Sequence, residues 1–193
     1  MAFFKNNVEI EESAKVVAWY CRKTIAALGA AKAGLTKIGP YAFFNFTNLT
    51  IIGLPTSLTD IGEHGLQGIK KLTVTEWPSG LTAIGAYGLS KIANLNITTL
   101  PNFVTLYEGV CWKSTGLKEM TIPSGVMTVS AYAFDACTDL TKVTFKAKPE
   151  TIHTTAFSED TALTDIYVPW SEGAVENAPW GATNATIHYK SEV

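Results

Sequence analysis

The sequence predicts a repeat solenoid. Six coils of about 23 residues stack on one continuous core, with a parallel strand ladder, an N-terminal helix and a C-terminal cap. The first observation behind this prediction is a series of prolines at a nearly constant interval. The second is that several series of apolar residues keep the same interval. Composition agrees, because 47% of the 193 residues are hydrophobic and only 17% are charged, which excludes a disordered chain.

The prolines define the period. Lys146 fills the fifth place of their series, which runs Pro55, Pro78, Pro101, Pro123, Lys146 and Pro169. A leucine lies six residues before each of them: Leu49, Leu72, Leu95, Leu117, Leu140 and Leu163. A small residue followed by an apolar one recurs in the same register, as in Ala42-Phe43 and Ala133-Phe134. One interval is a residue shorter, and the deletion falls in the loop after Pro101, where it costs little.

Each coil is expected to contain one strand and one turn. The segment before each proline, such as residues 117–122, alternates with period two and predicts a short strand. Strands of successive coils should stack in parallel about 4.8 Å apart, and the proline that follows should end the strand because it has no donor. The stretch from Ile38 to Phe46 predicts a short helical or 3₁₀ turn on the opposite face.

The complete repeat reads L-x-x-I-x-x-x-A-F-x-x-C-x-x-L-x-x-V-x-I-P and is clearest between Val126 and Phe145. It resembles the BspA-like leucine-rich repeats of bacterial surface proteins, which also occur in protist and phage proteins. The resemblance covers about residues 35 to 170 and implies an α/β-type leucine-rich-repeat solenoid. Thr75 and Thr98 depart from it, because they occupy a strand position that is apolar in the other coils.

The N-terminal segment, residues 1–34, differs from the repeats. An apolar stripe at spacings of four and three predicts one helix: Ile10, Ala14, Val17, Cys21, Thr24 and Leu28. The helix could cap the first coil, or it could mediate oligomerisation or attachment to a virion protein, since the stripe also fits a heptad. An acidic run at residues 9–12 and the lack of a long apolar core indicate that the segment is not a signal peptide.

The C-terminal segment, residues 171–193, is expected to close the solenoid. Ser171 suits the start of a short helix that ends before Pro179. Residues 185–189 predict a final strand. Trp170 and Trp180 are expected to cover the last coil, as terminal repeats need a cap.

The sequence contains no recognisable catalytic motif. A nucleophile elbow, a phosphate-binding glycine loop and an H-E-x-x-H motif are all missing. His64 falls on the rim of a coil, and His153 and His188 do not have metal-ligand spacing. Cys111 and Cys137 occupy apolar positions of the repeat and are expected to be buried hydrophobes. We therefore predict no enzyme, no cofactor and no metal site.

The net charge and the mean hydropathy limit the classes of partner that we expect. The net charge of −2 gives no basic excess that would favour nucleic acid. The mean hydropathy is +0.14, yet no apolar run approaches the roughly 20 residues of a membrane-spanning helix. We expect neither a nucleic-acid partner nor a membrane span.

The expected binding surface is the outer face of the sheet. Residues between the anchors should point away from the core, in one column of Ile51, Val74, Ile97, Glu119, Lys142 and Asp165. A second column runs Gly53, Glu76, Thr99, Thr121, Thr144 and Tyr167. The three adjacent aliphatics are the main candidate contact, with Glu76, Thr99, Thr121 and Tyr167 beside them, unless the N-terminal helix or a loop covers them. The charges at the end of the first column suit a ladder of opposite neighbours.

Trp112 and Phe44 share one position of the repeat and predict a second, convex contact. Together these surfaces predict a non-enzymatic binding protein whose sheet face takes a protein or glycan. Without a signal peptide, we expect a phage structural, decoration or host-attachment protein displayed on the virion. The alternative is a bacterial cell-surface adhesin domain separated from its leader, and an enzyme with an unrecognised site is a third reading.

Overall fold

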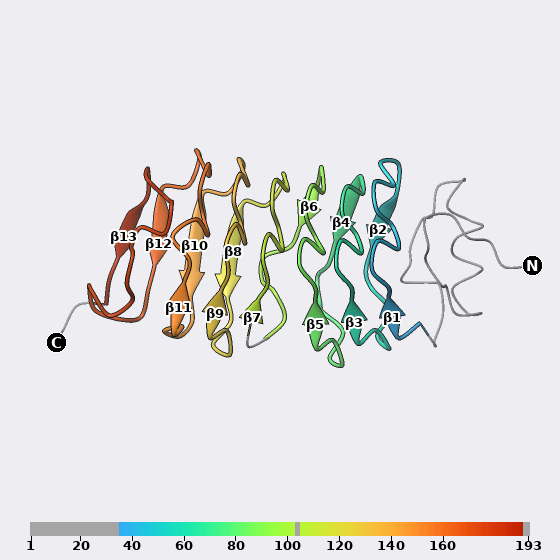
Figure 1. The fold of residues 1–193 in the computed structure, drawn as a ribbon, viewed down its shortest axis with the longest axis horizontal. Helices are drawn as coiled ribbons and strands as arrows, with labels where there is room; N and C mark the ends of the chain where they lie inside the picture. The colour runs from blue at the N-terminus through green and yellow to red at the C-terminus, as the bar shows by residue number, and fades with distance from the viewer. Residues whose placement is uncertain (1–34, 103–104, 191–193) are drawn as a thin grey trace, which may run out of the picture.

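The computed structural model describes residues 35–102 and 105–190, and within them the chain winds into coils stacked along one axis (Figure 1). The described strands form two rows. The upper row contains β2 (Thr50–Ile52), β4 (Lys71–Thr73), β6 (Leu95–Asn96), β8 (Glu119–Ile122), β10 (Lys142–Phe145), β12 (Asp165–Tyr167) and β13 (Thr186–His188). The lower row contains β1 (Lys37–Ile38), β3 (Asp60–Ile61), β5 (Ala83–Ile84), β7 (Thr105–Leu106), β9 (Thr128–Val129) and β11 (Thr151–Ile152). The predicted repeat solenoid is confirmed.

Each row is divided into two parallel sheets. The upper row forms β2-β4-β6 and β13-β12-β10-β8, which an isolated bridge between Thr99 and Thr121 connects. The lower row forms β1-β3-β5 and β11-β9-β7. Both divisions fall between the third and fourth coils, where the sequence period shortens by one residue.

The strands of the two halves turn different residues inward. In the first half Ile51 pairs with Leu72, and Leu72 pairs with Leu95. In the second half the paired buried residues are Met120, Val143 and Ile166, which lie three positions after their leucine anchors. Because side chains alternate along a strand, a shift of one residue exchanges the core and solvent faces.

The leucine anchors form the spine of the core. All six are buried. Leu49 is 5% exposed, and the other five are completely inaccessible: Leu72, Leu95, Leu117, Leu140 and Leu163. Cys111 and Cys137 are also buried without exposure. They pack as small apolar side chains, which confirms that prediction.

The expected helical turn over residues 38–46 is wrong. Residues 40–45 form turns instead, in which amides bond alternately within the coil and to the next one. The Phe44 amide donates to Tyr41 within the turn, whereas the Phe43 amide donates to the Gly65 carbonyl of the next coil. Alternation requires left-handed backbone at Tyr41 and Asn45, with φ of 56° and 57°. Amides used between coils are not available for a continuous helix.

The C-terminal cap is partly as expected. Trp180 is fully buried and Trp170 is 6% exposed, and both indoles contact Phe145, with ring centroids 6.3 and 5.3 Å away. The final strand is confirmed as β13, which pairs with β12. The short helix predicted after Ser171 is wrong, because residues 172–181 form turns and bends. The predicted N-terminal helix lies outside the described residues.

Candidate binding surfaces

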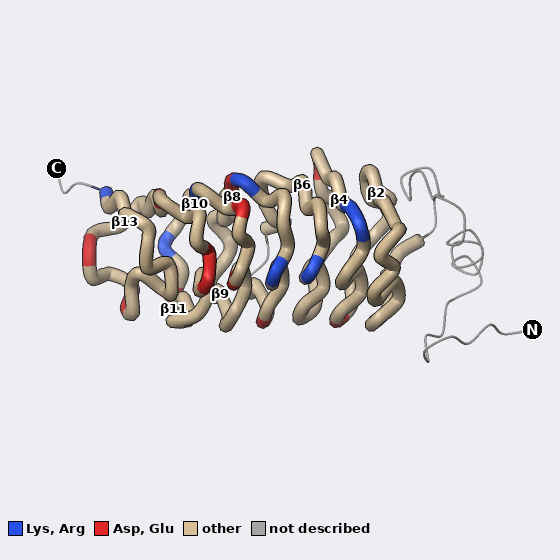
Figure 2. The backbone as a smooth tube through the Cα atoms, turned by 90° about the horizontal axis from the view of Figure 1, so that it is seen from above, with Lys and Arg blue, Asp and Glu red and all other residues tan. Residues whose placement is uncertain are grey.

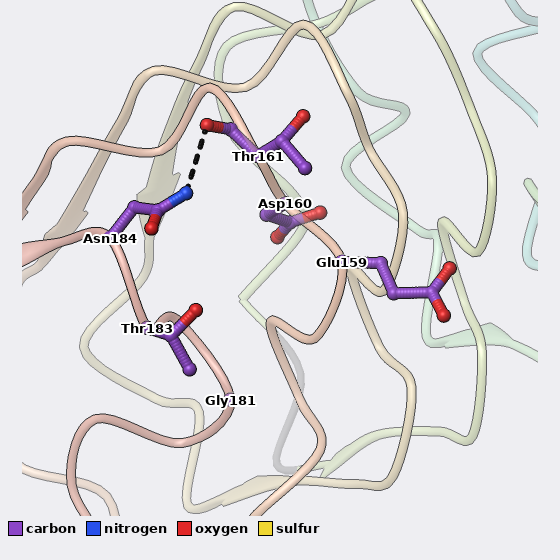
Figure 3. Close-up of a pocket in the computed structure, with 6 residues that line it drawn as sticks. All are labelled: Glu159, Asp160, Thr161, Gly181, Thr183 and Asn184. Atoms are coloured by element: carbon purple, nitrogen blue, oxygen red, sulfur yellow. Dashed lines mark hydrogen bonds between the residues drawn. The ribbon is translucent and has the colours of Figure 1, made fainter.

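The described part of the chain contains neither a cluster of metal-ligand side chains nor a membrane-spanning helix. Within it, no three His, Cys, Asp or Glu side chains are grouped so that they could hold a metal ion. Over the same residues, no helix is long and apolar enough to cross a membrane. A cavity of about 30 Å³ near the C-terminal end has space for roughly one water molecule. Its lining is Glu159, Asp160, Thr161, Gly181, Thr183 and Asn184 (Figure 3).

Charged side chains are scattered over the solenoid rather than gathered by sign. Figure 2 shows lysines and acidic residues as isolated segments of a tube that is mostly uncharged. Recognition by the described surface must therefore depend on particular side chains at particular coils. Three groups of side chains are candidates for such recognition: the aliphatic column, the strand face of the second half, and the aromatic row at the turns.

The aliphatic column does not reach the surface. Ile51, Val74 and Ile97 are 0%, 6% and 3% exposed and belong to the core, so their expected exposure is wrong. The outward position is instead one residue later, where Ile52 is 56% exposed. The sequence contained a sign of this difference. Thr75 and Thr98, one residue after Val74 and Ile97, are polar, although the repeat has an apolar residue at that position. Those threonines mark the shifted register.

The other predicted residues of the first half lie at the edge of this face. Glu76 is exposed, and Thr99 is half-buried. The Thr99 hydroxyl donates to the carbonyl of Thr121 in the next coil, 3.1 Å away. This hydrogen bond and the isolated bridge between Thr99 and Thr121 join the two halves of the row, where the continuous ladder is interrupted.

The strand face of the second half brings the remaining predicted residues together. Thr121, Thr144 and Tyr167 lie in register, and the column ends at His188. Beside it runs the column of Glu119, Lys142, Asp165 and Thr186. We name this set the strand-face site: Glu119, Thr121, Lys142, Thr144, Asp165, Tyr167 and His188.

Ion pairs and ring contacts hold the strand-face site in one arrangement. Lys142 Nζ lies 3.5 Å from Glu119 Oε2, which confirms the ladder of opposite charges. His188 Nε2 lies 2.7 Å from Asp165 Oδ1, and its ring stacks on Tyr167 with centroids 4.3 Å apart. Hydrogen bonds from the Thr164 hydroxyl and from His188 lower the pKa of Asp165. The carboxylate is therefore ionised at neutral pH.

His188 was not among the residues predicted to bind. Its strand was predicted, and it lies one 23-residue period after Asp165. That spacing could have related the two residues, but residues 171–193 were expected to form a cap outside the repeats. The parallel register brings the two together: Asp165 lies opposite Thr186 and Tyr167 lies opposite His188.

A row of aromatic side chains follows the turns of the first coils. Tyr41, His64 and Tyr87 share one position of the repeat, and their rings stack with centroids 4.6 and 5.1 Å apart. Gly109 takes that position in the fourth coil, where an added Cβ would lie 2.2 Å from a ring carbon of Tyr87. The stacked rings cover one another's faces, so this row mainly stabilises the contact between coils.

Acidic side chains accept hydrogen bonds from the tyrosine hydroxyls of the row. The Tyr87 hydroxyl donates to Glu108 Oε1 at 2.6 Å, and the Tyr41 hydroxyl donates to Glu63 Oε1 at 3.4 Å. Burial, followed by the hydrogen bond to Glu108, raises the pKa of Tyr87 to about 12. Both bonds are therefore formed at any physiological pH.

Trp112 continues the row in the space beside Gly109. Its side chain is half-buried, and its ring meets Tyr87 edge to face at 5.7 Å and 81°. The indole Nε1 donates to Asp135 Oδ2 at 2.7 Å. The ammonium groups of Lys91 and Lys113 lie 4.8 and 4.7 Å from the ring centroid. The predicted contact at Trp112 thus includes two basic side chains that the sequence analysis did not identify.

Comparison with known families gives one result. The family model described as "BspA type Leucine rich repeat region" matches in six copies, over residues 29–137 and 109–178. The matched residues contain every strand from β1 to β12, and the six copies agree with the six sequence repeats. A search of curated proteins and a search of solved structures found no significant match.

Proposed function

Because the chain belongs to the BspA-type leucine-rich-repeat family, we propose that it is a non-enzymatic binding protein whose strand-face site takes a protein or glycan partner. The observation that carries the proposal is the arrangement of the second half of the upper row. There a rigid parallel ladder holds both signs of charge and a tyrosine–histidine stack in register on one face. Ordered polar groups around an aromatic side chain are typical of recognition surfaces.

Preorganisation supports the proposal further. The backbone of β8, β10, β12 and β13 is fixed by pairing with neighbours, and the side chains restrain one another through the contacts described above. A partner that binds here pays little conformational entropy for ordering the site. Tyr167, which is 40% exposed, is the residue we expect to contribute most on burial by a partner.

The test is binding of the purified chain to arrays of immobilised glycans and extracellular-matrix proteins. We expect at least one specific ligand, whose affinity falls tenfold or more in Tyr167→Ala. Tyr107→Ala is the matched control, because Tyr107 is 48% exposed but follows β7 in the lower row. The proposal is wrong if the wild type binds nothing on either array, or if the two tyrosine variants weaken binding equally.

We propose that the protein is displayed on a phage virion as a structural, decoration or host-attachment protein. The resemblance to phage-borne repeats and the distinct composition of residues 1–34 support this role, with those residues joining a second copy or a virion protein. Deletion of residues 1–33 should prevent incorporation while the solenoid still folds, as judged by circular dichroism and by antibody labelling of purified virions. Unchanged incorporation would contradict it.

The alternative is a bacterial cell-surface adhesin domain. Antibody labelling of intact bacterial cells, in place of virions, would favour it. Both locations are consistent with the same strand-face site, so the location can be tested separately from the binding.

A further inference from the structure

We propose a second binding site for acidic carbohydrate, formed by Trp112, Lys91 and Lys113. The inference rests on the proposed function only for its premise that the chain binds rather than catalyses, and it concerns different residues. The ligand class is an oligosaccharide that carries carboxylate or sulfate groups.

Two lysines lie side by side because of the repeat. Lys91 and Lys113 occupy the same position of successive coils, which Asn45, Gly68, Ala136 and Glu159 fill elsewhere. The backbone there is left-handed, with φ of 51° and 54° for the two lysines. Their amides donate to the carbonyls of Trp112 and Asp135 in the following coils, at 2.7 and 2.8 Å. The main chain therefore fixes where both side chains begin.

Both ammonium groups are available to an anion. Lys91 and Lys113 are exposed, and neither forms an ion pair with a carboxylate in residues 35–102 or 105–190. Each instead approaches the indole of Trp112 within 5 Å of its centroid. A cation–π contact at an exposed site is weak. An anion that pairs with both lysines can therefore draw them off the ring at little cost.

Asp135 sets the orientation of the indole. Its carboxylate accepts the Trp112 Nε1–H, so the ring edge is anchored. The pKa of Asp135 is raised: burial and the charge of Glu159 raise it, and the bond from Trp112 and the charge of Lys113 offset this only in part. Tyr87 meets Trp112 with its ring nearly perpendicular, 81° between planes. Between them, these contacts hold the indole plane in place next to the two ammonium groups.

Carbohydrate fits this combination better than peptide. The apolar face of a sugar ring packs on a flat indole, and its acidic substituents reach outward to the flanking ammonium groups. The site offers two cations and one aromatic plane. An acidic peptide is accordingly the competing outcome of the test.

The experiment measures affinity by isothermal titration calorimetry with four probes. They are a heparin octasaccharide, an oligogalacturonate of similar length, neutral maltooctaose and an octaglutamate peptide. We expect one of the acidic oligosaccharides to bind at least tenfold tighter than maltooctaose and octaglutamate. Heparin binding would identify sulfate as the preferred group, and oligogalacturonate binding would identify carboxylate.

Matched variants locate the binding. Lys91→Gln/Lys113→Gln should weaken it tenfold or more, and Trp112→Phe, which removes the Nε1 donor and part of the ring, should weaken it severalfold. Lys146→Gln/Lys148→Gln changes the net charge equally at two exposed lysines after β10 and should have less than a twofold effect. Unfolding midpoints show that each variant is folded.

Three results would overturn the inference: no preference for either acidic oligosaccharide, equal losses in the two lysine double variants, or octaglutamate binding as tightly. None of these bears on the strand-face site, because Tyr167→Ala should leave oligosaccharide binding unchanged. Loss of oligosaccharide binding in Tyr167→Ala would place the ligand there instead and would also contradict the second site.

Discussion

Ile51 lies opposite Leu72 in the parallel ladder, not opposite Val74, the residue one 23-residue repeat further along. Ile51, Val74 and Ile97 all point into the core, so the candidate binding surface lies in the second half of the row. In that half the sequence repeat and the strand register agree, so Glu119, Lys142 and Asp165 face solvent as their spacing predicts.

We predict that stability falls as pH rises, because of Asp160. This side chain is 5% exposed, and burial raises its pKa to about 8. Repulsion from Asp135 raises the pKa further, while the bond from the Cys137 amide to Asp160 Oδ1, 2.7 Å, opposes the rise. In the same position of earlier coils Ser114 and Cys137 donate to backbone carbonyls. Asp160 Oδ2, in contrast, has no hydrogen-bond partner within residues 35–102 and 105–190.

The sign of this pH dependence follows from the number of protons that the folded and unfolded states bind. In the unfolded chain Asp160 ionises near pH 4, but in the folded chain it stays protonated until about pH 8. The folded state therefore binds more protons across this window, and the free energy of unfolding falls with rising pH, by at most about 1.4 kcal/mol per pH unit. Urea unfolding between pH 4 and 8 measures the slope. Asp160→Asn should flatten it, and an unchanged slope in this variant would contradict the prediction.

We predict that Gly109→Ala is strongly destabilising because two costs add. Gly109 has φ of +56°, and its added Cβ would meet the Tyr87 ring at 2.2 Å. Gly173→Ala is the control, since Gly173 has φ of +78° and its added Cβ would have no described residue within 4 Å. It should cost about 1 kcal/mol. Chemical unfolding should show a larger loss for Gly109→Ala. Tyr87→Ser in that background should recover part of it, and equal losses at the two glycines would exclude the clash.

We predict that Trp180→Ala opens the C-terminal end. Trp180 is fully buried, its Nε1 donates to the Glu176 carbonyl at 2.7 Å, and its ring faces Phe145 and Trp170. Removal of such a ring costs about 3–5 kcal/mol. Because coils contact only their neighbours, amide exchange should accelerate in β12 and β13 before β2 and β4. Uniform acceleration along the chain would show that the indole is not a local cap.

The sequence predicts the architecture and not the register. Four residue series with one period are enough to identify stacked coils, because each series marks one buried position. They do not fix which residue of a three-residue strand faces inward. In the second and third coils only Thr75 and Thr98 report the shift, and in the first coil Ile51 and Ile52 are indistinguishable by composition.

Some residues of the candidate sites could be identified from the sequence, and others could not. Tyr167, Thr121 and Trp112 could be identified because each keeps its position in the repeat. His188, Lys91 and Lys113 also lie at repeat spacings, but their roles depend on side-chain contacts between coils: His188 with Asp165, and the lysines with one indole. Such contacts follow from strand register and left-handed turns, which a single sequence does not specify.

The register is tested most directly at two adjacent isoleucines. Ile51 is completely buried and Ile52 is 56% exposed, although they are the same residue type in the same strand. We predict that Ile51→Ala lowers the free energy of unfolding by about 2–5 kcal/mol, and that Ile52→Ala changes it by no more than about 0.5 kcal/mol. Equal losses, or a larger loss for Ile52→Ala, would contradict the shifted register and return the aliphatic column to the binding surface.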